Sequence, residues 1–458
     1  MSHPQNRPPL DIGRTLDHGP FSTMQKMVVL MAALSIILDG FDGQLIGFAI
    51  PVIIKEWGIE RGAFAPAVAS GLVGMALGSA FAGYMADRIG RKLVIAASVA
   101  LFGATTIAIG FAPNIGAITV LRFIAGLGIG GALPSASTLT AEFTPLKYRT
   151  LAVTGTIVSY PLGGMLAGLF ASTVLPSLGW RAMFWIGGAL PLLYSLVLLA
   201  RLPESPRHMA RHSALWPRLR TLLARMERPT AVDAGFVDAA EHAAGQQPAG
   251  FAALFKDGLM RDTLAIWIGF FMVMLASYSA FSWLPSMLTA EGLPVSMASS
   301  GLTAYNLGGV LGALGCAWAI SRFGSRWPLL LACAGAAASA LLLQGVDFHR
   351  DASLLMLGLG VHGLFVNGVQ APMYALCAHV YATRIRATGT AAGLAFGRLG
   401  AILSSFAGAA IITSNGATGY LSLLGFAMLA ALVALAMVKR HIRSHRTPDR
   451  IEPVSRTA

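Results

Sequence analysis

The feature that most restricts the fold of this chain is a series of apolar segments, each about twenty residues long. A helix of that length crosses the roughly 30 Å hydrocarbon core of a bilayer. The composition agrees, because 55% of the 458 residues are hydrophobic and only 12% are charged, outside the usual range of soluble domains. We therefore predict an all-α integral membrane protein with twelve transmembrane helices. The predicted spans are 26–50, 64–86, 93–112, 116–140, 151–174, 182–201, 263–288, 298–320, 328–346, 352–376, 388–413 and 416–438.

The basic residues are distributed unevenly among the segments that connect these spans. Most of the 33 lysines and arginines fall on the side of the N-terminus. The positive-inside rule then places both termini in the cytoplasm. The net charge of +13 reflects this orientation, so we expect no nucleic-acid partner. The first apolar segment is too long for a cleaved signal peptide. The outer loops hold only Lys55, Arg61, Arg181 and Arg350.

One long polar segment divides the chain into two halves of six spans. It contains apolar residues spaced as on one face of a short amphipathic helix, namely Leu215, Leu219, Leu222 and Leu223. The predicted organisation is a cytoplasmic tail, a six-helix half, a cytoplasmic linker, a second six-helix half and a second cytoplasmic tail. These parts cover residues 1–25, 26–201, 202–262, 263–438 and 439–458.

The two halves weakly repeat each other. GYMADRIGRK at 83–92 has a degraded copy in AWAISRFGSR at 317–326, and GLGIGG at 126–131 has one in GLGVHG at 358–363. Both pairs have almost the same offset, about half the chain. Two six-helix pseudo-repeats with a substrate site between them near the midplane are typical of secondary transporters that rock between two states.

The few acidic residues that lie in or against the hydrocarbon are the candidates for carrying a proton. Asp39 and Asp42 lie one helical turn apart in the first span, and Glu142 lies near the cytoplasmic end of the fourth. An ionisable group at membrane depth costs roughly 2.5–3.5 kcal/mol, so such residues usually mark an ion or substrate pathway. Arg122, at a depth similar to Asp42, is the expected cation that modulates them. The alternative is a static Asp42–Arg122 ion pair, with Asp39 as the proton site.

The second half has no acidic residue within a predicted span, but it has Arg398 at the midplane. A lone buried cation is costly unless an anion binds it, so we predict that Arg398 binds a substrate carboxylate. The alternative is that helix carbonyls or the amides of Asn306 or Asn367 satisfy it. Aromatic rings and amides nearby suit a phenolic acid, and a histidine can relay protons. The predicted substrate-binding residues are Arg398, Tyr305, Asn306, Asn367, Gln370, Tyr374 and His362, with Tyr278 as a further candidate and Trp283 interpreted as a lipid-interface residue.

GYMADRIGRK matches the signature G-x-x-x-D-R-x-G-R, and on these residues the chain resembles the major facilitator superfamily. DGFDGQLIGFAIP, RFIAGLGIGGALPSASTLTAEFTP, PESPR and RIRATGTAAGLAFGRLGA are similar to the aromatic acid:H⁺ symporter family. This resemblance implies proton-coupled import of benzoate-like or hydroxyphenylalkanoate carboxylates across a bacterial inner membrane. The further acid that family members often carry in the eighth span is missing here.

The same resemblance implies that the loop at 83–92 latches the two halves on the cytoplasmic side. Asp87 would lie near a helix N-terminus of the other half, and Arg88 and Arg91 would pair with nearby acids. Glu142 and Arg149, in the run EFTPLKYR, are expected to join this network. The predicted gating residues are Gly83, Asp87, Arg88, Gly90, Arg91 and Arg149.

Other functions remain as alternatives. A drug:H⁺ antiporter would carry G-P-x-x-G-G in the fifth span, which is broken here by Tyr160 before Pro161. A sugar or polyol symporter shares PESPR, and another organic acid is also compatible. A membrane enzyme would need a nucleophile–base pair or clustered metal ligands, and the sequence shows neither pattern. We expect a monomeric transporter without cofactor or metal, whose partners are an aromatic carboxylate, protons and the lipid bilayer; a receptor would bind without accumulating its ligand.

Overall fold

The computed structural model describes residues 9–231, 235–238, 251–256 and 258–442. Ten helices in these ranges are long and apolar enough to cross a membrane. Two of them, α6 (Leu146–Arg201) and α14 (Thr383–Met437), are interrupted by Gly179 and Gly416, whose φ angles are 79° and 59°. Dividing both helices there gives the twelve predicted spans. The chain turns at these two places through a single glycine, where the sequence predicted short loops.

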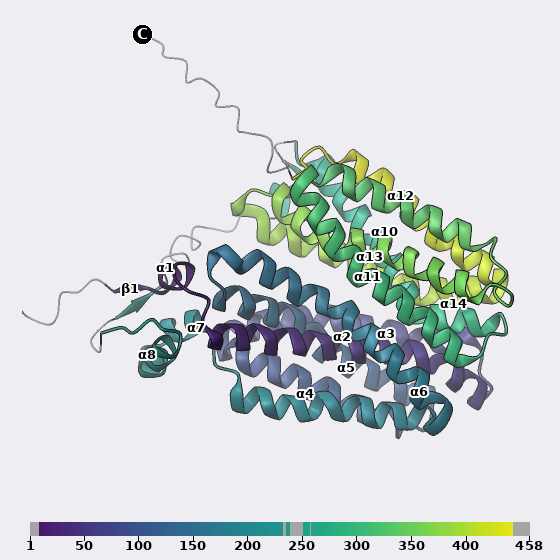
Figure 1. Cartoon of the computed structure of the whole chain (residues 1–458), viewed down its shortest axis with the longest axis horizontal. Helices are drawn as coiled ribbons and strands as arrows, with labels where there is room; N and C mark the ends of the chain where they lie inside the picture. Colours follow the sequence, from purple (N-terminus) through teal and green to yellow (C-terminus); the bar gives the residue numbers. More distant parts are fainter. Residues whose placement is uncertain (1–8, 232–234, 239–250, 257, 443–458) are drawn as a thin grey trace, which may run out of the picture.

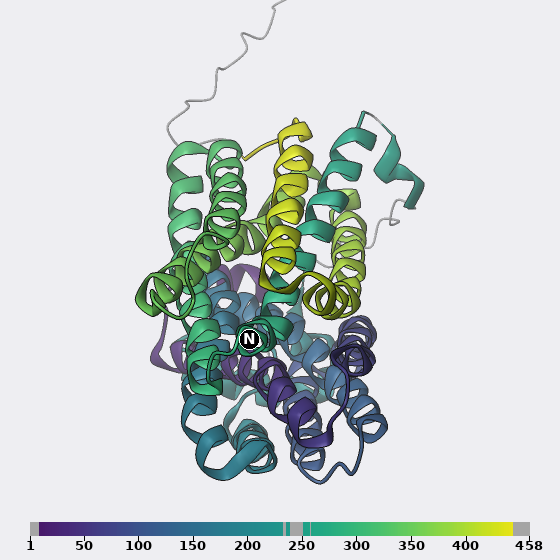
Figure 2. The same cartoon turned by 90° about the vertical axis from the view of Figure 1, so that its right-hand side faces the viewer.

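The helices form two bundles that lie side by side, coloured purple to teal and green to yellow in Figures 1 and 2. We call the bundle of α2 to α6 the N-half and the bundle of α10 to α14 the C-half. This arrangement confirms the predicted all-α membrane fold. The bounds of the other membrane helices are α2 (Thr23–Trp57), α3 (Arg61–Ile89), α4 (Arg91–Ile109), α5 (Ile115–Phe143), α10 (Met260–Ala290), α11 (Val295–Phe323), α12 (Arg326–Leu343) and α13 (Ala352–Val380).

Glycines bring equivalent helix pairs into backbone contact in the two halves. A Cβ atom added at Gly126 of α5 would lie 2.1 Å from the carbonyl oxygen of Gly71 of α3, and one added at Gly363 of α13 would lie 2.0 Å from that of Tyr305 of α11. Small residues allow membrane helices to approach this closely. The repeated motifs at 126–131 and 358–363 therefore have the same packing role in α5 and α13.

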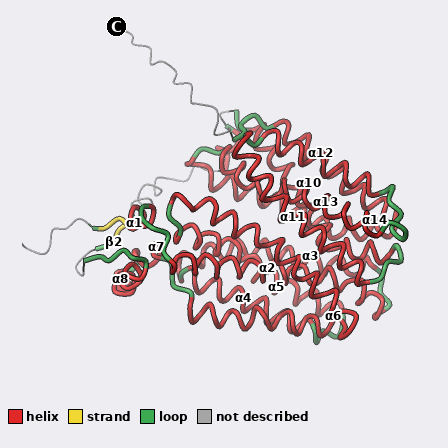
Figure 3. The backbone as a smooth tube through the Cα atoms, viewed as in Figure 1, coloured by secondary structure: helices red, strands yellow, loops and turns green. Residues whose placement is uncertain are grey.

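Short polar elements gather at one end of the bundle, at the left of Figure 1, which we call the linker end. The opposite end is the distal end. The predicted amphipathic helix is α8, and its Leu219, Leu222 and Leu223 are buried. A two-stranded parallel sheet pairs Leu10 with Phe236 (yellow in Figure 3), which the sequence did not predict. These elements are β1 (Leu10–Asp11), α1 (Ile12–Asp17), α7 (Pro206–Arg211), η1 (Ser213–Leu215), α8 (Trp216–Arg225) and β2 (Phe236–Val237).

The second part of the linker belongs to the C-half. Its 3₁₀ helix η2 (Phe251–Phe255) packs against α10, where the ring centroids of Phe251 and Trp267 are 5.9 Å apart. Thr263 of α10 donates a hydrogen bond to the carbonyl of Leu254 at 2.8 Å. Residues 239–250 of the predicted linker, and parts of both predicted tails (1–8 and 443–458), lie outside the described residues.

Candidate transport site and linker-end charge network

Asp39 and Asp42 are buried on α2, as their pattern predicted. A capping box between Ser22 and Gln25 fixes the start of this helix, so at 1.5 Å per residue Asp39 lies about 24 Å from Thr23. Within the described residues, no hydrogen bond of ordinary geometry reaches Oδ1 of Asp39 or either carboxylate oxygen of Asp42, although the hydroxyl of Thr106 interacts with Asp42. Burying a charged carboxylate without a hydrogen-bond donor or a salt bridge costs several kcal/mol of free energy. Both carboxyl groups therefore lie where a negative charge would be poorly compensated.

Each half supplies one arginine to these acids. Arg122 of α5 is buried and interacts electrostatically with Asp42, but no ion pair within 4.0 Å joins them. Arg398 of α14 interacts with Asp39 from the other half. The expected Asp42–Arg122 neighbourhood is thus present without a formed salt bridge. Arg398 was predicted to bind the substrate carboxylate. Its electrostatic interaction with Asp39 of the other half was not predicted.

Arg398 is held by neutral side chains. Its guanidinium donates a hydrogen bond to the Tyr278 hydroxyl at 2.9 Å and contacts Sδ of Met75 on α3. The guanidinium carbon Cζ of Arg398 lies 5.8 Å from the centroid of the Tyr278 ring. Tyr160 and Tyr374 lie close enough for electrostatic interaction with it. The amides expected in the alternative interpretation bond elsewhere, so the charge of Arg398 is surrounded mainly by tyrosines.

Asn306 and Asn367 make their hydrogen bonds away from Arg398. The Asn306 side chain bonds reciprocally with Gln44 of α2, with distances of 3.2 and 2.8 Å. Asn367 donates to the carbonyl of Gly363 at 3.2 Å. Neither amide is therefore among the hydrogen-bond partners described for the Arg398 guanidinium.

The other predicted substrate residues separate into two groups. Tyr374 and Gln370 are half-buried on α13, and Tyr374 is in the electrostatic surroundings of Arg398. Tyr305 and His362 are buried inside the C-half with their ring centroids 5.9 Å apart, and Nδ1 of His362 lies 3.0 Å from the hydroxyl of Ser339. These two residues contribute to C-half packing.

Trp283 was interpreted as a lipid-interface residue, and that interpretation is wrong. Its side chain is fully buried. The ring packs against Gly408 of α14, where an added Cβ would lie 2.5 Å from Cδ1 of the indole. The apolar segment around it gave no sign of which face is turned inward.

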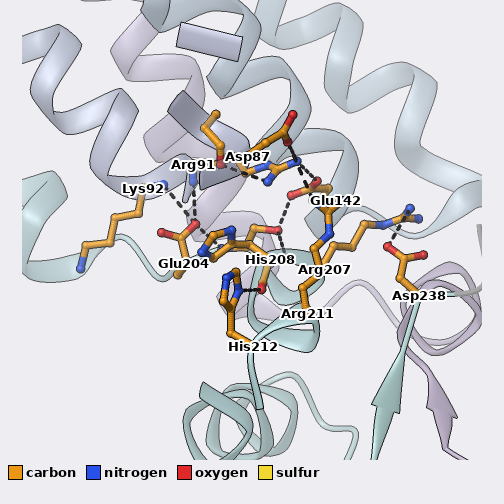
Figure 4. Close-up of polar contacts among 12 residues, drawn as sticks. Asp87, Arg91, Lys92, Glu142, Glu204, Arg207, His208, Arg211, His212 and Asp238 are labelled. Carbon is orange, nitrogen blue, oxygen red and sulfur yellow. Dashed lines mark hydrogen bonds and ion pairs between the residues drawn. The ribbon is translucent and has the colours of Figure 1, made fainter. Parts of the chain in front are cut away.

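Arg91 is the centre of a charge network at the linker end (Figure 4). Its guanidinium lies 3.0 Å from the carboxylate of Asp87 and 3.4 Å from that of Glu142. Asp87 also faces Arg211 of α7 at 4.0 Å. The structure thus groups Glu142 with the linker-end network and not with Asp39 and Asp42. Asp87 pairs within the N-half and the linker, whereas the resemblance implied a helix N-terminus of the C-half.

Glu204 caps the start of α4. This cap explains why position 90, in the motif GYMADRIGRK, is a glycine. Its Oε1 accepts hydrogen bonds from the backbone N–H groups of Arg91 at 2.8 Å and Lys92 at 3.2 Å. A carboxylate at a helix N-terminus is favoured by the helix dipole. Gly90 has φ 96° and ψ 158°, and a Cβ there would lie 2.2 Å from Oε2 of Glu204. Only glycine leaves room for this cap.

Ser205 connects the network to α7. Its hydroxyl donates to Glu142 and accepts from the backbone N–H of His208 at 3.2 Å, which makes it the N-cap of α7. The ring centroids of His208 and His212 are 4.6 Å apart, and burial lowers the pKa of His208 below its ordinary value. The motif PESPR at 203–207, which contributes to the family resemblance, is the sequence signal that contains Glu204 and Ser205.

Arg149, Arg88 and Gly83 lie outside this network, contrary to expectation for the two arginines. Arg149 pairs with Asp17 of α1 and donates to the carbonyl of Ala141 at 3.0 Å, so it closes the end of α5. The guanidinium of Arg88 lies 4.3 Å from the ring centroid of the exposed Tyr84. Gly83 has open space around it.

Two pseudo-equivalent six-helix halves, with buried acids in one and a half-buried cation of the other in their electrostatic surroundings, define a membrane transporter and not an enzyme. Residues 32–315 and 266–456 match the Major Facilitator Superfamily, and the chain belongs to that family.

Similar proteins and structures agree with this assignment. The 4-hydroxybenzoate transporter PcaK of Pseudomonas putida is 34% identical over 405 residues, which cover 88% of this chain and 90% of that protein. The gallate transporter of Pseudomonas putida is 31% identical over 449 residues, covering 98% and 99%. The inward open structure of the xylose transporter XylE from E. coli has a TM-score of 0.70 at 18% identity, over 91% of this chain and 96% of that one, and shows the common fold.

Proposed function

We propose that this protein imports an aromatic carboxylate together with protons by alternating access. The observation that supports it most is that Arg398 of the C-half contacts Met75 of the N-half, donates a hydrogen bond to Tyr278 at 2.9 Å, and lies within electrostatic range of Asp39. Arginine matches the geometry of a carboxylate, and tyrosine rings and hydroxyls suit a phenolic ring. Relatives named as 4-hydroxybenzoate and gallate transporters support the same substrate class.

The coupling follows from competition for one cation. When Asp39 is ionised, its negative charge and that of the substrate are alternative partners for Arg398. A protonated, neutral Asp39 leaves Arg398 free to bind the substrate carboxylate, so proton and substrate bind together. Asp42, with Arg122 beside it in the N-half, is the second candidate for the coupled proton.

The orientation in the membrane is part of the same proposal. The linker end carries Arg91, Arg149 and Arg211, most of the chain's basic residues fall in the sequence segments that connect at this side, and the positive-inside rule assigns that end to the cytoplasm. Both termini are then cytoplasmic, and the distal end faces outward from a bacterial inner membrane. We propose a single chain as the working unit, because both halves of the site come from it.

Uptake in cells expressing the protein tests the proposal. We expect 4-hydroxybenzoate, gallate or 3-(3-hydroxyphenyl)propionate to accumulate, and a protonophore to abolish accumulation. Asp39→Asn should lose accumulation but keep exchange of labelled for unlabelled substrate, because a neutral side chain mimics the protonated state. Arg398→Gln should lose both. Arg350→Gln, which removes an exposed arginine that lies 3.7 Å from the carboxylate of Asp347, is the matched control and should transport normally.

Two outcomes would contradict the proposal. Accumulation by Asp39→Asn that still collapses with the protonophore would remove Asp39 as the coupling group. Uptake of a sugar, with no uptake of any aromatic acid, would support the sugar symporter alternative.

A further inference from the structure

Gln44 and Asn306 form a buried polar contact between the two halves that the sequence analysis did not predict. Gln44 Nε2 donates to Asn306 Oδ1 at 3.2 Å, and Asn306 Nδ2 donates to Gln44 Oε1 at 2.8 Å. The exposed fractions of the two residues are 1% and 0%. Each amide therefore satisfies the other where water has no access, and separating them would leave buried polar groups unpaired.

The position of this pair along α2 places it next to the proton site. Gln44 is two residues beyond Asp42 on the same continuous helix. It lies about 32 Å from Thr23, on the distal side of Asp39. Tyr278 and Arg398 of the C-half also donate hydrogen bonds to Sδ of Met75 in the N-half. Met75 lies near the middle of α3, so these two contacts are closer to the midplane than the amide pair. The amide pair is thus the hydrogen-bonded crossing nearest the distal end among those described above.

Close backbone packing continues the contact beyond the amides. A Cβ added at Gly47 of α2 would lie 2.3 Å from the carbonyl oxygen of Phe281 of α10, and one added at Gly168 of α6 would lie 2.0 Å from Oγ1 of Thr303 of α11. The pair itself is accommodated by Gly164, where a Cβ would lie 2.1 Å from Nε2 of Gln44. The halves therefore meet tightly between the substrate site and the distal end.

We propose that Gln44 and Asn306 are positioning residues that form a latch, holding the distal side closed while the site is open toward the linker end. We call this pair the amide latch. The inference rests on the proposed alternating-access function. In each transport cycle the latch must break before Asp39 and Arg398 can be reached from the distal side, so its strength sets how often the distal side opens.

An amide latch has a property that an apolar contact lacks. Both partners carry one donor group and one acceptor, so exchanging them, Gln44→Asn with Asn306→Gln, keeps both the chemistry and the summed side-chain length. Removing either amide breaks both bonds and leaves the partner's amide oxygen without a donor, while Nδ2 of Asn306 can still donate to the carbonyl of Leu302 at 3.0 Å. Hydrogen bonds between membrane helices shift equilibria by about threefold on average and about twentyfold at most, which gives the expected size of the effect.

The test measures access to the distal side without using any substrate. The full-length protein carries Thr303→Cys as a reporter, with Cys316, Cys333 and Cys377 replaced by serine. A membrane-impermeant maleimide is added to the distal side of oriented vesicles, and the labelling rate is measured. We expect Gln44→Leu and Asn306→Leu to raise this rate about three- to twentyfold, and the exchanged pair to return it toward the parent value.

Two further variants keep the test decisive. Gln344→Leu removes an amide hydrogen bond within the C-half, to Ser422 at 3.1 Å, and should leave the labelling rate unchanged. Gln44→Asn alone, which keeps the amide but shortens it, should lie between the parent and Gln44→Leu, and it replaces Gln44→Leu if that variant does not fold. A labelling rate unaffected by Gln44→Leu or Gln44→Asn, or an exchanged pair that labels as fast as the single variants, would overturn the latch.

The result is independent of the substrate. If labelling changes as expected while none of the aromatic acids is taken up, the latch stands and the proposed substrate class fails. If the acids are taken up but labelling does not respond, the proposed function stands without the latch.

Discussion

Replacing Gly90 with alanine should destabilise the linker end strongly, and the structure gives the size of the effect. The backbone at Gly90 has φ 96° and ψ 158°, a region that is essentially restricted to glycine and costs other residues about 1–3 kcal/mol. The new Cβ would also lie 2.2 Å from Oε2 of Glu204. Glu204 would have to leave the N–H groups of Arg91 and Lys92, and loss of a helix cap costs about 0.5–2 kcal/mol. The expected total is about 1.5–5 kcal/mol.

Thermal unfolding in detergent, followed by size-exclusion chromatography, measures this loss, and uptake measures its effect on transport. Gly83→Ala in the same motif is the matched control, because Gly83 is helical and has open space around it. That change should be neutral or stabilising by up to about 1 kcal/mol. Gly90→Ala should also cost less in a Glu204→Ala background, since the cap is already lost there.

The reasoning would be refuted by either of two results. Equal thermal midpoints for Gly90→Ala and Gly83→Ala would show that neither the backbone angle nor the cap matters. Full additivity of Gly90→Ala and Glu204→Ala would show that Gly90 does not act through Glu204.

Three further predictions concern the linker end and the C-half. Ser205→Ala removes the N-cap of α7 and should lower stability by about 1–2 kcal/mol, whereas Ser205→Thr should retain most of it; a thermal midpoint for each variant decides this. Burial lowers the pKa of His208, so the unfolded chain binds that proton more readily, and stability should fall as the pH drops below the ordinary value of 6.5. His208→Gln should make the thermal midpoint less dependent on pH, and an unchanged pH profile would contradict this. Gly363→Ala should cost about 1–3 kcal/mol by forcing α11 and α13 apart, whereas Gly315→Ala, with nothing within 4 Å, should not lower the thermal midpoint.

The membrane architecture could be predicted because it follows from the length and apolar character of the segments. Spans of about twenty apolar residues are required by the bilayer, and the offset of the two repeats gave the two halves. The β1–β2 pairing could not be predicted, because it joins two-residue strands at Leu10 and Phe236, too short to leave a periodic pattern.

The sequence was sufficient to select the charged residues of the candidate site. It was not sufficient to predict which of them interact with each other. Acids and arginines at membrane depth stand out because each is costly there, so Asp39, Asp42, Arg122 and Arg398 could be selected from the sequence. Depth along a helix does not determine rotation about its axis, which is why the Arg398–Asp39 proximity and the burial of Trp283 were not foreseen. Uncharged polar side chains cost less at membrane depth than charged ones, so the Gln44–Asn306 contact could not be selected from the sequence in the same way.

Charge alone also misassigned partners in the linker-end network. Arg149 lies close in sequence to Glu142, which suggested one network, but the chain leaves α5 at Thr144 and turns Arg149 toward Asp17. Glu204 was not considered because its partners are backbone N–H groups, which no sequence pattern of opposite charges reveals.

The linker is fastened separately to each half. Its first part is tied to the N-half through the Ser205–Glu142 contact and to β1 through β2, while η2 is tied to the C-half through Leu254. Only the twelve residues 239–250 connect Asp238 to Phe251, and at 3.3–3.6 Å per residue the thirteen steps from Asp238 to Phe251 span at most about 47 Å. A cut within this stretch would leave both fastenings intact, so the two pieces, produced as separate chains, should each carry a complete bundle and reassemble into a working transporter.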